Sequence, residues 1–307
     1  MSAKRGNTTD GTGAGPSQPG EVPTPLVSPQ WLAAHLDDPR LRIFDVTVRL
    51  GIEPETGRLS AESGREVFEN GHIPGSAFVD LSELKDRERP DLHMLPSAEA
   101  FAAVMGAAGV GEGTHVVAYD IGAGMWATRL WWMLRVFGFD AVSVLDGGFR
   151  AWTAGGHPVS TDPTAYPQCH FEPHYRPELV ASAAEVAAQV ASARGWLVNA
   201  LSPEVFRGDP APGYKRGGRI PGSVNVPYYT LLDSETGRFL SPDRIGEQFA
   251  AAGVTEANGP VATYCGNGFA ATVAAFGLAL LGRSDVAVYD GSLAEWASDP
   301  SRPLESD

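Results

Sequence analysis

One stretch of the chain combines a nucleophile with a backbone that could hold an anion, Tyr264-Cys265-Gly266-Asn267-Gly268-Phe269-Ala270. An apolar β-like run, 260–264, precedes the cysteine, and a small-residue helical run, 270–281, follows it. Open α/β sheets carry their chemistry where the strands end. Two glycines let the loop curl so that N–H groups and the positive end of the helix face the sulfur. The stretch therefore predicts a stabilised thiolate, although a free cysteine is often only a small buried hydrophobe.

The chemistry that this loop permits is covalent sulfur transfer. The loop contains no Lys or Arg, and no histidine lies near Cys265 in the sequence, so amide dipoles would have to stabilise the thiolate. The same cradle would suit a persulfide, which is also anionic. A cysteine phosphatase is the rival interpretation, but it needs a longer loop closed by an arginine that grips the phosphate. Here Ala271 follows the loop, and the next arginine, Arg283, lies at the far end of the helix.

The elements that must position this loop occur twice in the chain. Four blocks match in the same order at offsets of 144 to 147 residues: 71–76 with 218–223, 117–120 with 262–265, 142–147 with 286–291, and Trp152 with Trp296. Such a repeat indicates a duplicated domain. In each half, short β-rich runs alternate with helical runs, which predicts an α/β fold of tandem duplicated domains, each a parallel sheet with helices on both faces. Asp120 stands where the second half has Cys265, so we expect one active site.

The composition places the domain boundaries. Residues 1–25, rich in Gly, Thr, Ser and Pro, are predicted to be a disordered tail rather than a signal peptide. A non-catalytic first domain is expected over 26–155, a Pro-rich linker over 156–180, and the catalytic second domain over 181–307. In the first half, strands are expected over 41–48, 115–119 and 141–145, and helices over 31–36, 98–106 and 126–137. Cys169, in the linker, is interpreted as an incidental thiol.

The charge and cysteine content exclude several classes of protein. A net charge of −14 over 307 residues argues against nucleic acid or an anionic membrane surface as a partner. No apolar run is long enough to span a membrane. Two cysteines do not make a disulfide framework, and no Cys/His cluster has metal-ligand spacing. We therefore expect a cytoplasmic protein without a metal or another cofactor.

The duplicated domain, the paired Gly-x-Ile-Pro-Gly turns and the Cys265 loop resemble those of the two-domain rhodanese-type sulfurtransferases, over roughly residues 26–303. The Cys-Gly-x-Gly loop and the blocks 93–96 and 131–133 are more similar to the 3-mercaptopyruvate branch, because thiosulfate rhodaneses usually carry basic residues just after the cysteine. The resemblance implies a persulfide on Cys265. Its sulfur would come from 3-mercaptopyruvate or thiosulfate, and its acceptor would be cyanide, thioredoxin or another thiol.

The chain also departs from the family pattern. Asn267, Phe269 and Ala270 stand where the family usually has Ser, Val and Thr, and Phe269 is expected to add bulk at the mouth of the site. The family's strand-end Asp-x-Arg is Asn199-Ala200-Leu201 here, so the donor's acid group needs other cations. The predicted substrate-binding residues are therefore Gly266, Asn267, Gly268, Phe269, Ala270, Arg207 and Arg219, with Lys215 and Arg216 as further candidates. Cys265 is the predicted catalytic residue.

Three interpretations remain open at this point. The first is an enzyme that turns over a small sulfur donor through Cys265. The altered loop and the lost arginines motivate a second, a persulfide carrier or binding module that takes sulfur only from a protein. The third, an inactive paralogue, is weakened by the retained cysteine and glycines. His72 is expected to be a structural turn residue, and Asp120 a helix cap or a polar wall.

Overall fold

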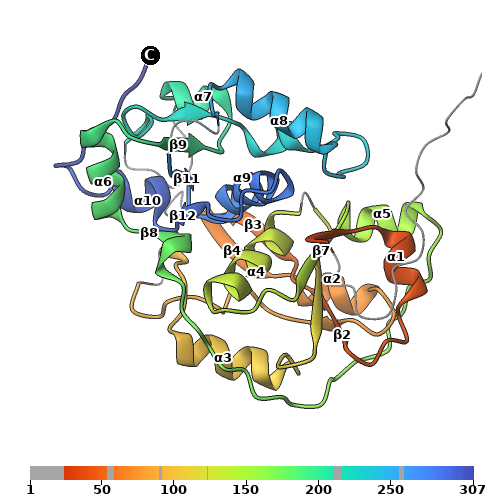
Figure 1. Cartoon of the computed structure of the whole chain (residues 1–307). Coiled ribbons are helices and arrows are strands. Elements are labelled where there is room, and N and C mark those ends of the chain that lie inside the picture. The colour runs from red at the N-terminus through yellow and green to blue at the C-terminus, as the bar shows by residue number, and fades with distance from the viewer. Residues whose placement is uncertain (1–23, 54–58, 90–91, 123, 210–215, 256–258) are drawn as a thin grey trace, which may run out of the picture.

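The computed structural model describes residues 24–53, 59–89, 92–122, 124–209, 216–255 and 259–307 (Figure 1). In this part of the chain each half forms a five-stranded sheet in which all strands are parallel. The strand order is β1-β7-β6-β2-β5 in the first half and β8-β12-β11-β9-β10 in the second. The two orders correspond strand by strand, so the predicted duplicated α/β fold is confirmed.

The first half contains these elements in chain order: β1 Leu26–Val27, α1 Pro29–Ala34, β2 Leu41–Asp45, β3 Val48–Ile52, β4 Leu59–Ser63, α2 Arg65–Asn70, β5 Ala77–Phe78, α3 Ala98–Ala107, β6 His115–Tyr119, α4 Met125–Val136, β7 Val142–Leu145 and α5 Gly148–Ala154. The predicted tail lies outside the described residues except for Thr24 and Pro25. The Pro25 carbonyl accepts the N–H of Val144, so the chain is already bound to β7 at this point.

The second half contains η2 Pro177–Leu179, β8 Val180–Ala181, α6 Ala183–Ser192, β9 Trp196–Asn199, α7 Pro203–Arg207, β10 Val224–Asn225, η3 Tyr228–Leu231, α8 Pro242–Ala251, β11 Val261–Tyr264, α9 Phe269–Leu280, β12 Ala287–Tyr289 and α10 Ser292–Trp296. Local sequence explains where several helices begin. Ser182 and Glu185 form a capping box at the start of α6, and Ser28 caps α1, whose first residue is Pro29.

One feature of the first half was not predicted from the sequence. The strand expected over 41–48 ends at Asp45, and a second strand begins at Val48 and pairs with β4 in an antiparallel hairpin. Leu50 and Ile52, on one face of this hairpin, are 44% and 54% exposed. The sequence pattern alone does not separate the two strands, although only the first of them, β2, belongs to the parallel sheet.

The strands alternate their side chains between two apolar cores. In β6, Val116 and Ala118 face α3 and α4, whereas Val117 and Tyr119 face α1 and α5 on the outer side. Helices α4 and α9 lie side by side in the middle of the molecule, between the two sheets (Figure 1). Apolar side chains from both halves form one continuous cluster around these helices. Ten of the twelve residues of α9 are buried, as expected for a helix that is apolar on every side.

Candidate active site

The alternation along β11 decides where the predicted nucleophile points. Ala262 and Tyr264 belong to the outer core, whereas Val261 and Cys265 belong to the inner cluster between the halves. Cys265 follows the last residue of β11 and is 2% exposed. Its side chain therefore lies on the side of the sheet that carries α9 and faces the first half.

The segment after β12 holds the backbone of Cys265 from two directions. The Cys265 N–H donates to Ser292 Oγ at 3.0 Å. The carbonyl of Cys265 accepts the Leu293 N–H at 3.1 Å, and the carbonyl of Gly266 accepts the Ala294 N–H at 2.9 Å. Ser292 has φ +48°, in the left-handed region that non-glycine residues rarely adopt, and is fully buried. Backbone strain is thus present beside the nucleophile, where it is often found in functional sites.

Gly268 closes the loop and begins α9 in a left-handed conformation, with φ +79°. A Cβ at this position would lie 2.6 Å from Asp290 Oδ1 and 2.7 Å from the Asp290 carbonyl oxygen, so only glycine fits. Among the described residues, no protein oxygen accepts a hydrogen bond from the N–H groups of Gly266, Asn267 and Gly268. The loop therefore keeps donors available for an anion, together with the N-terminus of α9.

In the first half, the corresponding loop binds the carboxylate of one of the chain's own residues, Asp120. Asp120 directly follows β6 as Cys265 follows β11, and its Oδ1 accepts the N–H groups of Gly122 and Gly124 at 2.8 and 3.1 Å. Its Oδ2 accepts those of Trp126 and Ala127 at 2.9 and 3.1 Å. The carboxylate thus caps α4 and fills the cradle, as expected of a cap. Burial raises the pKa of Asp120, while the four amide donors oppose that rise.

A buried ion pair links the first half to the end of the loop that follows Cys265. Arg129 of α4 and Asp290, which follows β12, are 3% and 1% exposed and pair through Nη1 and Oδ1. Nη1 of the same guanidinium lies 3.5 Å from the Gly268 carbonyl oxygen, and Nη2 donates to the His93 carbonyl oxygen at 3.0 Å. The guanidinium also lies over the ring of Phe269, 5.8 Å from its centroid. Sequence reasoning identified neither Arg129 nor Asp290 as site residues.

The predicted loop residues are together, but they differ in how far they are exposed. Phe269 is 6% exposed and packs against Trp126 of α4, with ring centroids 4.6 Å apart. It therefore packs at the boundary between the halves, and the expectation that it adds bulk at the mouth of the site stays a prediction. Ala270 is also buried, whereas Asn267 is partly exposed. Asn267 is the loop side chain that an incoming ligand can reach.

The two predicted arginines have acidic partners of their own. Arg219 pairs with Asp307 at 2.8 Å, lies 3.7 Å from Glu305, and stacks over Phe206. The adjacent Ile220 belongs to the outer core, on the face of β11 opposite the nucleophile. Arg207 is 52% exposed and lies 3.7 Å from Glu204. A role for Arg207 and Arg219 in donor binding stays a prediction.

The remaining candidates have structural surroundings. Arg216 donates to the carbonyl oxygens of Ala297, Asp299 and Arg302, and Lys215 lies outside the described residues. His72 is 1% exposed, and its ring nitrogens lie 2.8 and 3.0 Å from two carbonyl oxygens, as expected of a turn residue.

Tyr228, in η3, is a partly buried residue that packs against the inner cluster to which Cys265 belongs. Burial raises the pKa of its phenol, and Tyr229 and Cys265 raise it further by charge repulsion.

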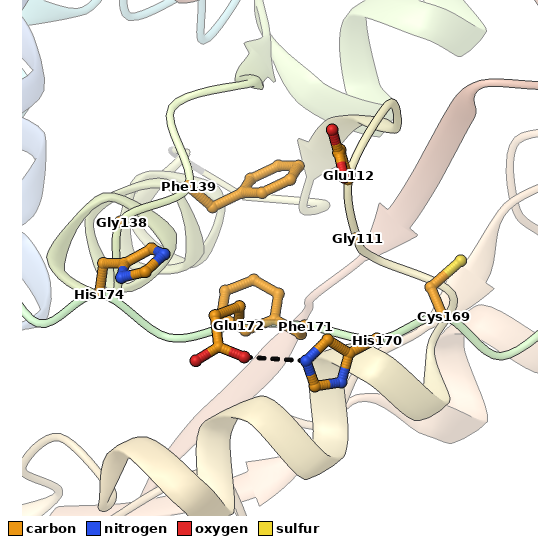
Figure 2. Close-up of a pocket in the computed structure, with 9 residues that line it drawn as sticks. All are labelled: Gly111, Glu112, Gly138, Phe139, Cys169, His170, Phe171, Glu172 and His174. Carbon is orange, nitrogen blue, oxygen red and sulfur yellow. Dashed lines mark hydrogen bonds and ion pairs between the residues drawn. The ribbon is translucent and has the colours of Figure 1, made fainter.

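A groove of about 570 Å³ lies away from this site, at the amino ends of β6 and β7 (Figure 2). It is lined by Gly111, Glu112, Gly138, Phe139, Cys169, His170, Phe171, Glu172 and His174. Figure 2 shows His170 bonded to Glu172, while His174 and the Cys169 thiol stand apart from this pair. No group of metal-ligand geometry occurs in the part of the chain described. The Cys169 thiol donates to the Pro167 carbonyl oxygen at 3.7 Å.

Comparison with known proteins agrees with this architecture. The model of the rhodanese-like domain matches residues 28–155 and 185–299. The human 3-mercaptopyruvate sulfurtransferase is 39% identical over 280 residues, which cover 88% of this chain and 91% of the human protein. The thiosulfate sulfurtransferase of Gallus gallus is 35% identical over 278 residues, 88% of this chain and 92% of that protein. The crystal structure of SseA from Escherichia coli, described as a 3-mercaptopyruvate sulfotransferase, has a TM-score of 0.75, 32% identity, and coverage of 88% and 99%.

The chain belongs to the family of rhodanese-like proteins, and it carries two copies of the domain. With this similarity over most of its length, it is an enzyme of the sulfurtransferase class. Within the described residues, no helix is long and apolar enough to cross a membrane.

Proposed function

We propose that the protein moves a sulfane sulfur from 3-mercaptopyruvate or thiosulfate to a thiol or cyanide acceptor through a persulfide on Cys265. The observation that carries this proposal is the correspondence between the two strand-end loops. In the first half, four amides surround the Asp120 carboxylate. The corresponding loop of the second half has a thiol in place of that carboxylate and amides free to stabilise its anion or that of a persulfide.

The reaction proceeds in two halves. The Cys265 thiolate attacks the donor sulfur, a sulfur–sulfur bond forms, and the carbon–sulfur bond of 3-mercaptopyruvate breaks. The thiol proton of the donor goes to the carbon that leaves, which gives pyruvate and a Cys265 persulfide anion. With thiosulfate, the sulfur–sulfur bond of the donor breaks and sulfite leaves. The acceptor thiolate then attacks the outer sulfur and restores Cys265, so ping-pong kinetics are expected.

The loop favours 3-mercaptopyruvate as the donor. Gly266 and Asn267 follow the cysteine, so the loop offers no cation to the second negative charge of thiosulfate. Relatives named for each donor occur among the similar proteins. The acceptor is proposed to be a thiol such as that of thioredoxin. Both cysteines are free, which is consistent with a reducing compartment and with the predicted cytoplasmic location.

Intact-mass measurement in a single turnover tests the proposal. Reduced wild-type protein, Cys265→Ser and Cys169→Ser are mixed separately with 3-mercaptopyruvate and with thiosulfate. We expect wild type and Cys169→Ser to gain the mass of one sulfur atom, faster with 3-mercaptopyruvate, and Cys265→Ser to gain none. Cys169→Ser is the matched control because it removes the other thiol of the chain.

A gain of sulfur that persists in Cys265→Ser would overturn the assignment of the nucleophile. A wild-type protein that gains no sulfur from either small donor would instead favour the persulfide carrier, which takes its sulfur from a protein. The altered loop, with Asn267 and Phe269, is the observation that favours this second candidate.

A further inference from the structure

We infer that Arg129, a residue of the non-catalytic half, is a positioning residue of the sulfur-transfer site. The inference rests on the proposed function and extends it to the half that lacks a nucleophile. Arg129 holds three groups at once: the Asp290 carboxylate, the Gly268 carbonyl and the His93 carbonyl. Two of these groups belong to the catalytic half, and Gly268 is the last residue of the loop that follows Cys265.

The guanidinium is held rigidly at this place. It is 3% exposed, and it lies 4.7 Å from the ring centroid of Trp132 and 5.8 Å from that of Phe269. A planar guanidinium with several donors suits such a fixed arrangement better than a flexible ammonium group. Phe269 is the first residue of α9, so the arginine contacts both residues that join the loop to the helix. Its position therefore sets the direction of the peptide groups at the end of the cradle.

Because the domain is duplicated, the hydrogen bond by which Asp290 joins the two halves can be compared with that of its counterpart, Asp146. Asp146 Oδ1 accepts the N–H of Phe239 at 2.9 Å, and Asp290 Oδ2 accepts the N–H of Leu95 at 2.7 Å. Each bond crosses from one half to the other, and both members of the two pairs are 144 positions apart. The two aspartates thus join the halves in the same way, and neither hydrogen bond involves an arginine. Beside Asp146 the second half places Arg238, whose charge opposes the rise that burial causes in the pKa of Asp146.

The arginine is the part that breaks the symmetry. Position 273, the counterpart of Arg129 on α9, is a buried valine, so α9 supplies no cation at this place to the first-half loop. That loop carries Asp120, whose carboxylate orders its own amides. The catalytic loop has no carboxylate to order it before a sulfur anion forms. Arg129 supplies this order from outside, by fixing the Gly268 carbonyl and the Asp290 that packs against Gly268.

The test separates this role from simple stabilisation of the fold. Arg129→Met alone leaves Asp290 buried without its cation, which is destabilising in itself. The double variant Arg129→Met/Asp290→Asn removes both charges and keeps an oxygen that can accept the Leu95 N–H. We expect the double variant to keep the near-ultraviolet circular dichroism of the wild type, with a melting temperature within about 5 °C.

Single-turnover persulfide formation is then measured over a range of 3-mercaptopyruvate concentrations. We expect the maximal rate of the double variant to fall about 10- to 100-fold, because small misplacements of reacting groups cost this much, while the half-saturating concentration changes less than threefold. Arg129→Lys keeps the charge but carries its three donors on one nitrogen, which cannot reach partners that two guanidinium nitrogens contact, so it should lose about 3- to 10-fold.

Arg135→Met is the matched control. Arg135 lies on the same helix and also crosses to the second half, where it donates to the Ser284 carbonyl, but it does not contact the loop. Its persulfide rate should stay within twofold of the wild-type rate.

Two results would overturn the inference. One is a folded double variant, or a folded Arg129→Lys, with the wild-type rate. The other is an equal loss in Arg135→Met. If the double variant does not fold, Arg129→Lys decides between the same outcomes. A wild-type protein that forms no persulfide would contradict the proposed function itself, which is a different and separately visible result.

Discussion

Thr128 on α4 and Thr272 on α9 meet across the boundary between the halves, with their hydroxyl oxygens 2.9 Å apart. These residues are 144 positions apart in the sequence and occupy the same place in the two copies of the domain. A residue that contacts its own counterpart lies on the axis that relates the copies. The approximate twofold axis of the molecule therefore passes between these two hydroxyl groups.

The two threonines should be energetically coupled. Each hydroxyl also lies within hydrogen-bonding distance of a carbonyl of its own helix, so the pair shares its protons among several acceptors. We expect Thr128→Val and Thr272→Val each to lower the free energy of unfolding by about 1 kcal/mol, and the double variant to lose less than the sum. Urea unfolding followed by tryptophan fluorescence measures this cycle. Thr153→Val, at an exposed hydroxyl of α5, is the control, and strict additivity would contradict the coupling.

Gly268→Ala should inactivate the enzyme. The new Cβ would lie within 3 Å of two oxygens of Asp290, and the left-handed φ adds strain. We expect the rate of persulfide formation to fall at least about 100-fold and the free energy of unfolding to fall by about 2 to 4 kcal/mol. Gly282→Ala, at the other end of α9, is matched in backbone conformation with φ +86° but has open space around it. It should cost only about 1 kcal/mol and leave the rate unchanged, and equal effects of both variants would refute the steric explanation.

The buried carboxyl of Asp45 should make the protein less stable at neutral pH than in mild acid. Burial raises the pKa of Asp45 from 3.8 to about 6, and the nearby Asp120 adds to the rise. Between about pH 4 and pH 6 the folded state keeps a proton that the unfolded chain releases, so stability falls as the pH rises through this window. The resulting penalty above pH 6 is of order 3 kcal/mol.

Asp45→Asn should remove this penalty. The second half carries Asn199 at the corresponding strand end, and its Oδ1 accepts a backbone N–H as Asp45 Oδ1 does. We expect the variant to be more stable than the wild type by about 1 to 3 kcal/mol at pH 7.5 and equally stable at pH 3.5. Denaturation at both pH values gives the comparison, with Asp86→Asn on an exposed loop as the control. A gain that is the same at both pH values would show that the charge is not its cause.

Much of the architecture could be predicted from the sequence because it depends on local pattern. The strand 115–119 was predicted with both ends correct, since a short apolar run between flanking Gly, Thr and Asp residues marks it. The helix expected over 126–137 begins at Met125 and ends at Val136. The β3–β4 hairpin was missed because its apolar face, with Leu50 and Ile52, is exposed and gives the same pattern as a buried strand.

The site was predictable where a repeat or a motif marked it, and not where distant segments meet. Cys265 and its glycines stand in one loop, so their proximity follows from the sequence. Arg129 and Asp290 are 161 positions apart, and their pairing depends on how the two halves pack. Ser292 could have been found, because it directly follows the repeated Asp-Gly block and differs from its first-half counterpart, Gly148. Such a difference between the halves marks the half that carries the cysteine. The packing of Phe269 against Trp126 could not be predicted, because it too depends on how the two halves pack.

The single apolar cluster around α4 and α9 makes the two copies of the domain dependent on each other. Either half alone would present a helix such as α9, buried along nearly its whole length, to water. The duplicated domains should therefore melt in one cooperative transition rather than two. Neither copy should therefore fold stably when it is expressed alone, because each copy completes the interior of the other.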